Sequence, residues 1–307
     1  MRIGILSQNS ALYSTRRLVA AAEARGHEPE VIETTAVAVE IIPDRSLPAP
    51  IKLIRTTTML TAAFQRTAVA YISPVDAIIP RIGASITDYG LAVVRQFESQ
   101  GITTTASSWG VAQSRNKLHS LQLMDGAGLP VPRTVVVEQP KALANAIEAV
   151  GGTPVVVKLI QSTQGQGVIK ARNLATATAV WDKLRRLRQQ ILVQEYVAEA
   201  DGRDLRVLVV GDRCVAAMER QASDGDFRSN LHRGGTAVAV DVEPAVAELA
   251  LEAARLHRLN VAGVDIIQSR RGPLVLEVNS SPGLEGIETA TAVDVAGDII
   301  KFLEKAL

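Results

Sequence analysis

Several residue types are scarce in this chain of 307 residues, and their scarcity excludes whole classes of protein. A single cysteine, Cys214, excludes an intramolecular disulfide framework and every metal site built from several cysteines, which fits a reducing compartment. No run of about 18 uncharged apolar residues occurs, so we expect neither a signal peptide nor a membrane span. The sequence therefore predicts a soluble cytoplasmic protein without a membrane partner.

Charge of one sign is not in excess either, because 33 basic residues stand against 32 acidic ones. This balance leaves no global field that would attract nucleic acid or an anionic membrane. Aromatic residues, which stack on bases, make up only 3% of the chain. We therefore expect no direct nucleic-acid ligand. The HExxH pattern of zinc peptidases and the GxSxG pattern of serine hydrolases are missing as well.

What the chain does contain is an alternation of strand and helix patterns. In the first hundred residues, apolar runs such as RIGILS and DAIIPRIG alternate with amphipathic stretches, so we expect a small parallel α/β layer. Ser14 is the expected N-cap of the first helix, and Gly26 is expected to end it. The stretch from Pro43 to Pro74 fits either a helix or a pair of strands, and its structure stays open.

A second module is expected after two short helices between Ser107 and Ala127, where GLPVPRTVVV starts a new strand. Strands and helices then alternate as far as ILVQEY. After residue 200 the pattern becomes richer in strands, with a hairpin that turns at Gly211 and Asp212. We therefore predict an α/β (α+β) chain in three parts, namely residues 1–110, 111–192 and 193–307.

Two strands near the C-terminus, GVDII and LVLEV, carry acids among apolar residues. A symmetric hairpin around Arg271 pairs Asp265 with Glu277, and carboxylates opposed at about 5 Å between Cβ atoms repel unless a cation neutralises them. Asn279 shares the face of Glu277 because side chains alternate along a strand. Three oxygen donors predict a Mg²⁺ or Mn²⁺ site. The alternatives are a solvated face paired with Arg270 or Arg271, and a one-residue register slip that separates the acids.

A second polar feature follows the strand VVVKLI. Lys158 ends that strand, and the turn STQGQGV behind it contains Gly165 and Gly167, which let backbone N–H groups approach phosphate oxygens. The turn is neither a Walker A loop, because no GK[ST] follows, nor a dinucleotide fingerprint, because Lys170 stands where the third glycine belongs. The segment predicts a phosphate-binding lid, with an ordinary β-turn as the alternative.

The four histidines lie outside these two patterns. His27 and His257 follow predicted helices and are expected at the surface, while His119 lies within a helix. His232 belongs to QASDGDFRSNLHRGG, a polar stretch of the kind that is more often functional than idle inside a compact domain. It is therefore the one histidine that we consider for a functional role.

The order of several segments resembles the ATP-grasp ligases and, among them, the RimK-type α-L-glutamate ligases that modify a small-subunit ribosomal protein. These segments are SRNKLHS, VVVKLI with STQGQGV, VQEY, GRDLRVLVVGD, GDFRSNLHRGG, VAGVDII and LVLEVNSSPGLEGIE. The likeness extends to ILSQNSALYSTRRL and AIIPRIGASITDYG, so it covers nearly the whole chain. It implies an ATP-grasp fold behind an N-terminal Rossmann-like pre-ATP-grasp domain. The segment from Arg45 to Ser73 departs from the family pattern, which bears on the acceptor.

The resemblance also implies roles for individual residues. Two of them, Lys158 and Arg228, would be catalytic. The implied binding residues are Lys117 and Lys158 on the ATP phosphates, Gly165 and Gly167 in the lid, Glu195, Tyr196 and Asp204 around adenine and ribose, Arg228, Ser229 and Asn230 at the nucleotide and acyl phosphate, and Asp265, Glu277 and Asn279 as ligands of two Mg²⁺ or Mn²⁺ ions.

The implied reaction activates an acceptor carboxylate with ATP and joins it to the amine of L-glutamate. The implied acceptor is the C-terminal tail of a ribosomal protein or a poly-glutamate peptide, and the implied assembly is a homo-oligomer such as a tetramer. Two alternatives stay open. One is a glutamate ligase for a small acceptor, such as a coenzyme tail or an amino-acid-biosynthesis carrier, and the other is a non-catalytic ATP-binding regulatory module.

Overall fold

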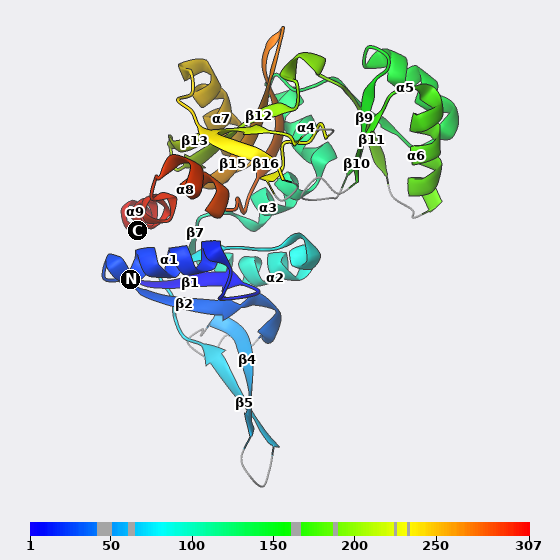
Figure 1. Cartoon of the computed structure of the whole chain (residues 1–307). Helices are drawn as coiled ribbons and strands as arrows, with labels where there is room; N and C mark the ends of the chain where they lie inside the picture. Colours follow the sequence, from blue (N-terminus) through cyan, green and yellow to red (C-terminus); the bar gives the residue numbers. More distant parts are fainter. Residues whose placement is uncertain (42–50, 61–64, 161–166, 187–189, 224–225, 232–233) are drawn as a thin grey trace.

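The computed structural model describes residues 1–41, 51–60, 65–160, 167–186, 190–223, 226–231 and 234–307. Within these ranges no helix is both long and apolar enough to cross a membrane. The described strands form four sheets, and Figure 1 shows an N-terminal body with a projecting hairpin, a larger C-terminal body above it, and a small helix-covered sheet to one side.

The N-terminal body is built on a parallel sheet of strand order β2-β1-β6-β7. Neighbouring residues of a strand point to opposite faces, so Ile5 packs with the helix α1 while Leu6 packs with the helix α2. This arrangement confirms the parallel α/β layer expected for the first hundred residues. The elements are β1 (Arg2–Ser7), α1 (Tyr13–Ala24), β2 (Glu28–Glu33), β6 (Ala77–Pro80), α2 (Thr87–Glu98) and β7 (Thr103–Thr104).

The start of α1 differs from the expectation that Ser14 caps it. The helix begins at Tyr13, and Leu12 occupies the N-cap position without a capping hydrogen bond from its side chain. The hydroxyl of Ser14 instead accepts a hydrogen bond of 3.0 Å from the backbone N–H of Leu284, which ties α1 to the C-terminal body. Gly26 does close the helix, with a φ of 76° that only glycine adopts without strain.

The segment left open between Pro43 and Pro74 is a strand pair in its described part. The strands β3 (Val37–Val39), β4 (Ile51–Leu60) and β5 (Gln65–Ile72) form an antiparallel sheet. Leu53 and Ile72 at its base are buried in the core of the N-terminal body. From that anchor the hairpin projects away from the rest of the molecule (Figure 1).

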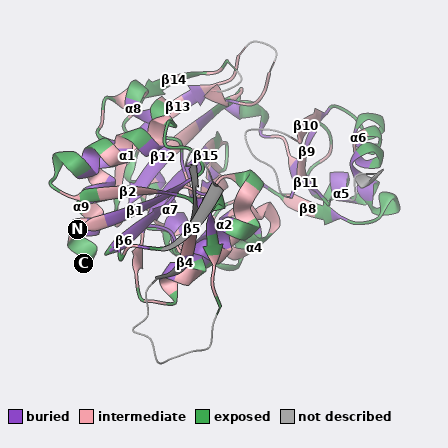
Figure 2. Ribbon diagram, turned by 90° about the horizontal axis from the view of Figure 1, so that it is seen from below, coloured by how far each residue is buried: buried purple, intermediate pink, exposed green. Residues whose placement is uncertain are grey.

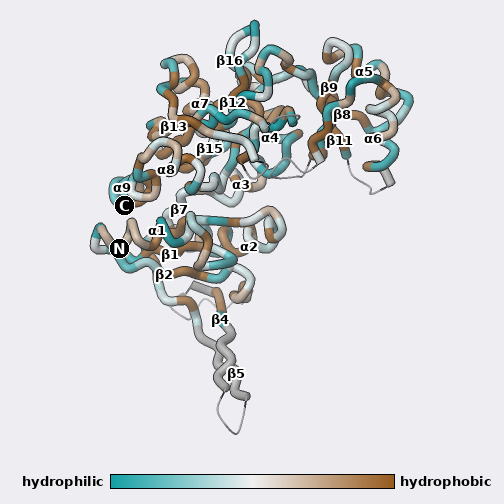
Figure 3. Tube along the Cα trace, in the orientation of Figure 1, coloured by the Kyte–Doolittle hydropathy of each residue, from teal (hydrophilic) through white to brown (hydrophobic). Residues whose placement is uncertain are grey.

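The small sheet at the side has the antiparallel order β10-β9-β11-β8, and its helices α5 and α6 pack on one face. Figure 3 shows hydrophobic stretches along its strands β9 and β11. All four strands lie where the sequence predicts them. The elements are β8 (Thr134–Val137), α5 (Leu143–Ala149), β9 (Val155–Leu159), β10 (Val168–Ala171), α6 (Leu174–Arg186) and β11 (Ile191–Glu195).

The C-terminal body contains an antiparallel sheet of order β14-β13-β12-β15-β16. One face packs against α3, α4 and α7, and the other shares a core with α8, α9 and the N-terminal body. In Figure 2 buried residues concentrate along the central strands β12 and β15. The elements are α3 (Ser108–Arg115), α4 (Lys117–Gly126), β12 (Arg203–Val210), β13 (Arg213–Gln221), β14 (Thr236–Ala239), α7 (Pro244–Leu256), β15 (Val261–Ser269), β16 (Gly272–Asn279), α8 (Glu285–Thr291) and α9 (Val295–Ala306).

The division into three parts stays our proposal, with two changes to its edges. A boundary at residue 192 would cut β11, whose residues Ile191–Glu195 pair with β9 as one strand. The helix α4 and the part of α3 from residue 111 onward, assigned by sequence to the central part, contribute Val111, Leu121 and Met124 to the core of the C-terminal sheet. We therefore place the central unit between the end of α4 and the end of β11.

His257 corrects another expectation, because its side chain is buried rather than exposed at the end of α7. Its exposure is 0%, and its Nδ1 lies 2.7 Å from the carbonyl oxygen of Ala253. Nε2 lies 2.8 Å from the hydroxyl of Ser120 on α4. Burial lowers the pKa of His257 below its ordinary value, although the hydrogen bond to Ala253 opposes that shift. The imidazole therefore joins α4 to α7 in its neutral form.

Candidate functional site

A cavity of about 720 Å³ collects residues from all three parts of the fold. The loops after β1 and β6 contribute one wall, the small sheet a second, and the C-terminal sheet a third. Of the residues predicted for the site, eleven line this cavity: Lys117, Lys158, Glu195, Tyr196, Asp204, Arg228, Ser229, Asn230, Asp265, Glu277 and Asn279. The sequence therefore selected residues that the fold brings together.

The two lid glycines have different outcomes. Gly165 and His232 lie outside the described residues. Gly167 lies in the turn before β10 with a φ of 65°, and a Cβ there would come 2.4 Å from Cδ1 of Leu159. Glycine is thus required at residue 167 by the turn itself.

The predicted pairing of Asp265 with Glu277 is confirmed, but the turn differs from the symmetric hairpin expected around Arg271. Ser269 pairs with Gly272, so the turn centres between Arg270 and Arg271. If that register continued unchanged, Glu277 would lie on the opposite face of the sheet from Asp265. A β-bulge beside Asp265 shifts the register by one residue and restores the pairing with Glu277.

Asp265 is neutralised by the protein itself. Its Oδ1 accepts a hydrogen bond of 2.7 Å from Nε of Arg206, and its Oδ2 accepts one of 2.7 Å from the same guanidinium. A guanidinium nitrogen of Arg220 lies 3.1 Å from Oδ2 as well. Burial alone would raise the pKa of Asp265, but the two arginines hold it below its usual range. The repulsion between the opposed acids therefore does not require a bound cation, contrary to the inference from sequence.

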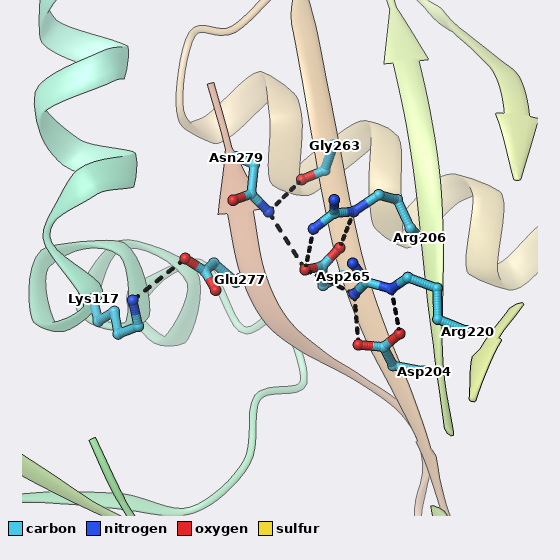
Figure 4. A network of polar contacts seen from close by, with 8 residues as sticks. All are labelled: Lys117, Asp204, Arg206, Arg220, Gly263, Asp265, Glu277 and Asn279. Carbon is cyan, nitrogen blue, oxygen red and sulfur yellow. Dashed lines mark hydrogen bonds and ion pairs between the residues drawn. The ribbon is translucent and has the colours of Figure 1, made fainter. Parts of the chain in front are cut away.

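Asp204 belongs to the same network, which Figure 4 shows from close by. Asp204 and Arg220 are direct cross-strand partners on β12 and β13, and their side chains form two hydrogen bonds of 2.7 and 2.6 Å. Asp204 therefore pairs across the sheet with Arg220, while Arg206, on the same strand as Asp204, pairs with Asp265. Although burial disfavours its charge, the carboxylates of Asp265 and Asp204 raise the pKa of Arg220 above its ordinary value. Cross-strand pairs of opposite charge thus stabilise this face of the sheet.

Glu277 turns away from the arginines and toward α4. Its Oε1 lies 3.4 Å from Nζ of Lys117, while Nδ2 of Asn279 donates to the carbonyl oxygen of Gly263 at 3.2 Å and approaches Oδ2 of Asp265 at 3.5 Å. Figure 4 shows these side chains on one face of the β15–β16 pair. The shared face predicted for Glu277 and Asn279 is therefore present.

The donor set at this face suits an oxygen-preferring cation in part. Oε2 of Glu277 and Oδ1 of Asn279 accept no hydrogen bond from the described part of the chain, so each can accept a hard cation. Both oxygens of Asp265 are already held by guanidinium groups. Among the described residues, no three His, Cys, Asp or Glu side chains form a metal cluster. Glu277 and Asn279 therefore fit Mg²⁺ or Mn²⁺ better than Asp265 does.

Lys158 lies on β9 at the cavity wall, facing the same region as Lys117 and Glu277. Burial lowers the pKa of Lys158 to about 8, although Glu277 opposes that shift. A buried ammonium group is favoured by an anion that replaces its lost water. The position is suited to a phosphate.

At the other end of the cavity, Glu195 and Tyr196 follow β11. Glu195 accepts a hydrogen bond of 2.8 Å from the backbone N–H of Arg133 and is also bonded to Arg271. Nζ of Lys170 lies 3.6 Å from the centre of the Tyr196 ring, a cation–π contact. Both residues line the same cavity as Lys158. Their roles at adenine and ribose stay predictions.

Arg228 crosses from the C-terminal body to the small sheet. It forms hydrogen bonds of 2.9 Å with both carboxylate oxygens of Asp226, and it donates to the carbonyl oxygen of Val168 on β10 at 3.2 Å. Ser229, beside it, is 8% exposed, and Asn230 follows at the cavity wall. The guanidinium of Arg228 thus lies between the C-terminal body and the small sheet, a position that suits an anionic ligand bound between them.

Five cavity arginines were not selected from the sequence as site residues, namely Arg81, Arg115, Arg203, Arg206 and Arg220. For Arg206 and Arg220 a signal existed, because residues of alternating charge on paired strands predict cross-strand ion pairs once the register is known. For Arg81 and Arg115 no local pattern marks them. They come from different elements, and only the tertiary fold places both at one cavity.

Comparisons with known proteins agree with this architecture. The chain matches the RimK-like ATP-grasp domain over residues 114–303 and the RimK pre-ATP-grasp domain over residues 1–47 and 57–111. It is 47% identical over 305 residues to a probable alpha-L-glutamate ligase of Vibrio cholerae serotype O1, covering 99% of this chain and 96% of that protein. A probable alpha-L-glutamate ligase of Syntrophotalea carbinolica is 48% identical over 309 residues, with coverage of 99% and 96%.

Solved structures show the same fold at lower sequence identity. A RimK domain ATP-grasp protein from Sphaerobacter thermophilus superposes with a TM-score of 0.71 at 21% identity, covering 98% of this chain and 99% of that one. The ATP-grasp ligase PsnB, in complex with a minimal precursor, Mg and ADP, gives a TM-score of 0.70 at 22% identity, with coverage of 99% and 97%. The fold expected from the resemblance is thereby confirmed.

Proposed function

The chain belongs to the RimK-like ATP-grasp family, and from this premise we propose that it is an ATP- and Mg²⁺-dependent ligase that joins L-glutamate to a peptide carboxylate. The observation that carries the proposal is the single cavity in which Lys117, Lys158 and Glu277 meet residues from all three parts of the fold. Two cations beside a hard-cation site suit a nucleoside triphosphate.

The proposed reaction has two steps. An oxygen of the acceptor carboxylate attacks the γ-phosphorus of ATP, the bond to the β-phosphate oxygen breaks, and ADP leaves an acyl phosphate. The unprotonated amine of glutamate then attacks the acyl carbon, an amide bond forms, the amine loses a proton and inorganic phosphate departs. Every atom of the new bond comes from the substrates, so no side chain needs to act as a nucleophile.

The chain's own residues would bind and orient these substrates. Lys117 and Lys158 would neutralise ATP phosphates, and Arg228, tied to β10 through Val168, would meet the transferring phosphoryl group. Glu277 and Asn279 would hold Mg²⁺, with Asp265 as a further ligand only if its bonds to the arginines are exchanged. The metal, when bound, would supply charge stabilisation for the phosphoryl group.

The adenine end of the cavity completes the proposed nucleotide site. Glu195 and Tyr196 would contact adenine, and Ser229 and Asn230 would lie near the phosphates. Asp204 is a weaker choice for ribose, because Arg220 already occupies both of its oxygens. We therefore expect Asp204 to act mainly by holding Arg220.

For the acceptor we propose the C-terminal tail of a small-subunit ribosomal protein, or a short poly-glutamate peptide that the enzyme extends. Support comes from relatives named probable alpha-L-glutamate ligase that align with the whole length of this chain. The test is mass spectrometry of ribosomal proteins and glutamate-ended peptides incubated with the chain, ATP, Mg²⁺ and L-glutamate. Mass increments of whole glutamyl residues are expected.

Two outcomes would redirect the proposal. Turnover with a small acceptor and none with protein or peptide ends would make the chain a glutamate ligase of another pathway. Tight ATP binding without phosphate release, with every acceptor tried, would make it a nucleotide-binding regulatory module. The Glu277→Gln variant serves as the matched blank, because it removes one carboxylate of the proposed metal site and little volume.

A further inference from the structure

Two arginines from different elements, Arg81 and Arg115, line the cavity beside the proposed metal site. Arg81 follows β6, and its guanidinium donates a hydrogen bond of 2.7 Å to the carbonyl oxygen of Pro282. Arg115 ends α3, and its guanidinium donates to the carbonyl oxygen of Ile82. Each arginine is thus held by a backbone carbonyl that belongs to a different segment.

These two charges have no close carboxylate partner among the described residues. A guanidinium has five N–H donors, and neither arginine forms an ion pair of 4.0 Å or less within the described ranges. Burial and, to a smaller extent, the charge of Arg115 lower the pKa of Arg81 to about 10. Burial also lowers the pKa of Arg115, with Glu277 opposing the shift. Both arginines are half-buried at one cavity wall, and two like charges held there are stabilised by an anion.

The pair lies next to the proposed reacting centre rather than at the nucleotide end. Arg115 stands two residues before Lys117, whose Nζ is 3.4 Å from Oε1 of Glu277. Pro282, the hydrogen-bond acceptor of Arg81, stands three residues after Asn279. By contrast, Glu195 and Tyr196 follow β11 in the small sheet. An anion held by both arginines would therefore lie within reach of the acyl phosphate.

We propose that Arg81 and Arg115 bind the two carboxylates of the incoming glutamate, one guanidinium for each carboxylate, and so select a dicarboxylic amino acid as the amine donor. This assignment rests on the proposed function and extends it to the amino-acid subsite. Planar guanidinium forks match carboxylates in two-point contacts, which suits selection better than a lysine would. Because the two arginines lie on separate elements, they hold the two carboxylates of glutamate at a fixed separation. The amine of the bound glutamate is thereby oriented toward the acyl phosphate.

The test uses the full chain with ATP, Mg²⁺ and a peptide that ends in glutamate, and it compares Arg81→Gln and Arg115→Gln with the wild type. Loss of a charge-assisted contact should raise the KM for glutamate about tenfold or more and leave the KM for ATP within about twofold. L-glutamine lacks the side-chain carboxylate, and the α-amide of glutamate lacks the other. One variant should lose the preference of glutamate over glutamine, and the other should lose the preference over the α-amide.

Controls separate this role from a structural one. Arg95→Gln, at an exposed position of α2, should keep wild-type constants. Arg81→Lys and Arg115→Lys keep the charge but lose the fork, so they should retain the fold and show an intermediate KM for glutamate. If a glutamine variant fails to fold, the KM for glutamate of the corresponding lysine variant tests the proposal instead.

Three outcomes would overturn the assignment, and they are distinguishable. An unchanged KM for glutamate with unchanged preferences would remove the arginines from the amino-acid subsite. An equal rise in the KM for ATP would assign them to the phosphates instead. A wild-type chain that shows no glutamate-dependent ADP release would refute the proposed function itself, before any variant is measured.

Discussion

Asp265 and Glu277 are direct partners across the β15–β16 pair, yet their carboxylates turn to different cations. Asp265 is held by Arg206 at 2.7 Å. Glu277 lies 3.4 Å from Lys117 and has one oxygen to spare. The two acids are therefore not equivalent, and the longer contact with Lys117 marks Glu277 as the one that can exchange its partner for a metal.

The first prediction concerns that carboxylate. Glu277→Gln should lower the rate of ADP formation at saturating substrates by at least about a hundredfold, because removal of a group that stabilises the phosphoryl transition state typically costs that much. The circular dichroism spectrum and the midpoint of thermal unfolding should change little, since Glu277 is only half-buried. Glu23→Gln, at an exposed position of α1, is the control. Near-normal turnover of the Glu277 variant would refute the metal assignment.

The second prediction concerns the buried ion pairs. Arg220→Met should lower the free energy of unfolding by about 3 to 5 kcal/mol, because it leaves Asp204 buried without its charged partner. Arg203→Met, exposed on the neighbouring strand β12, should change it by no more than about 0.5 kcal/mol. Urea unfolding followed by circular dichroism measures both.

A double variant tests the cause of that loss. Adding Asp204→Leu to Arg220→Met removes the unpaired carboxylate, so a large part of the lost stability should return. If the double variant is as unstable as the sum of the single ones, then lost packing explains the effect and the ion pair does not.

The hairpin shows how far the sequence could lead. Strand alternation and a turn near Arg271 were enough to predict the pairing of Asp265 with Glu277, and the pairing is present. The turn itself is one half-residue away from the expected centre, and a β-bulge makes up the difference. A bulge is set by local packing of both strands, so the sequence of one strand does not reveal it.

The partners of the acids show what could not be predicted. Arg206 and Arg220 stand 59 and 45 positions before Asp265 in the sequence, and their contacts follow from the order of strands in the sheet. The prediction that His257 lies at the surface, made from its place after a helix, was wrong because the side chain is buried and bonded to polar groups. In each case the tertiary neighbour decides, and local periodicity carries no information about it.

The third prediction uses Lys158, whose pKa is about 8 because of burial. A bound phosphate favours the charged form and raises that pKa, so binding of a non-hydrolysable ATP analogue should take up a proton at pH 8 to 9. Affinity should therefore fall as the pH rises through about 8. Calorimetry in two buffers of different ionisation enthalpy measures the uptake.

The matched variant for this prediction is Lys158→Arg, which stays charged throughout the range. Its binding should show no proton uptake from residue 158, and its affinity should depend less on pH. Equal proton uptake by the wild type and the variant would show that Lys158 does not contact the phosphates.

The fourth prediction concerns His257 and the stability of the C-terminal body. Its pKa in the folded chain is lowered from 6.5 by burial, so the unfolded chain binds a proton at a higher pH than the folded chain does. Stability is therefore complete above pH 6.5 and decreases as the pH falls from there through the lowered pKa, by up to about 1.4 kcal/mol per pH unit. His257→Gln should remove this part of the pH dependence, while His119→Gln, exposed on α4, should keep it. Urea unfolding between pH 7 and pH 5 measures the slope, and identical slopes for the wild type and His257→Gln would contradict the buried neutral imidazole.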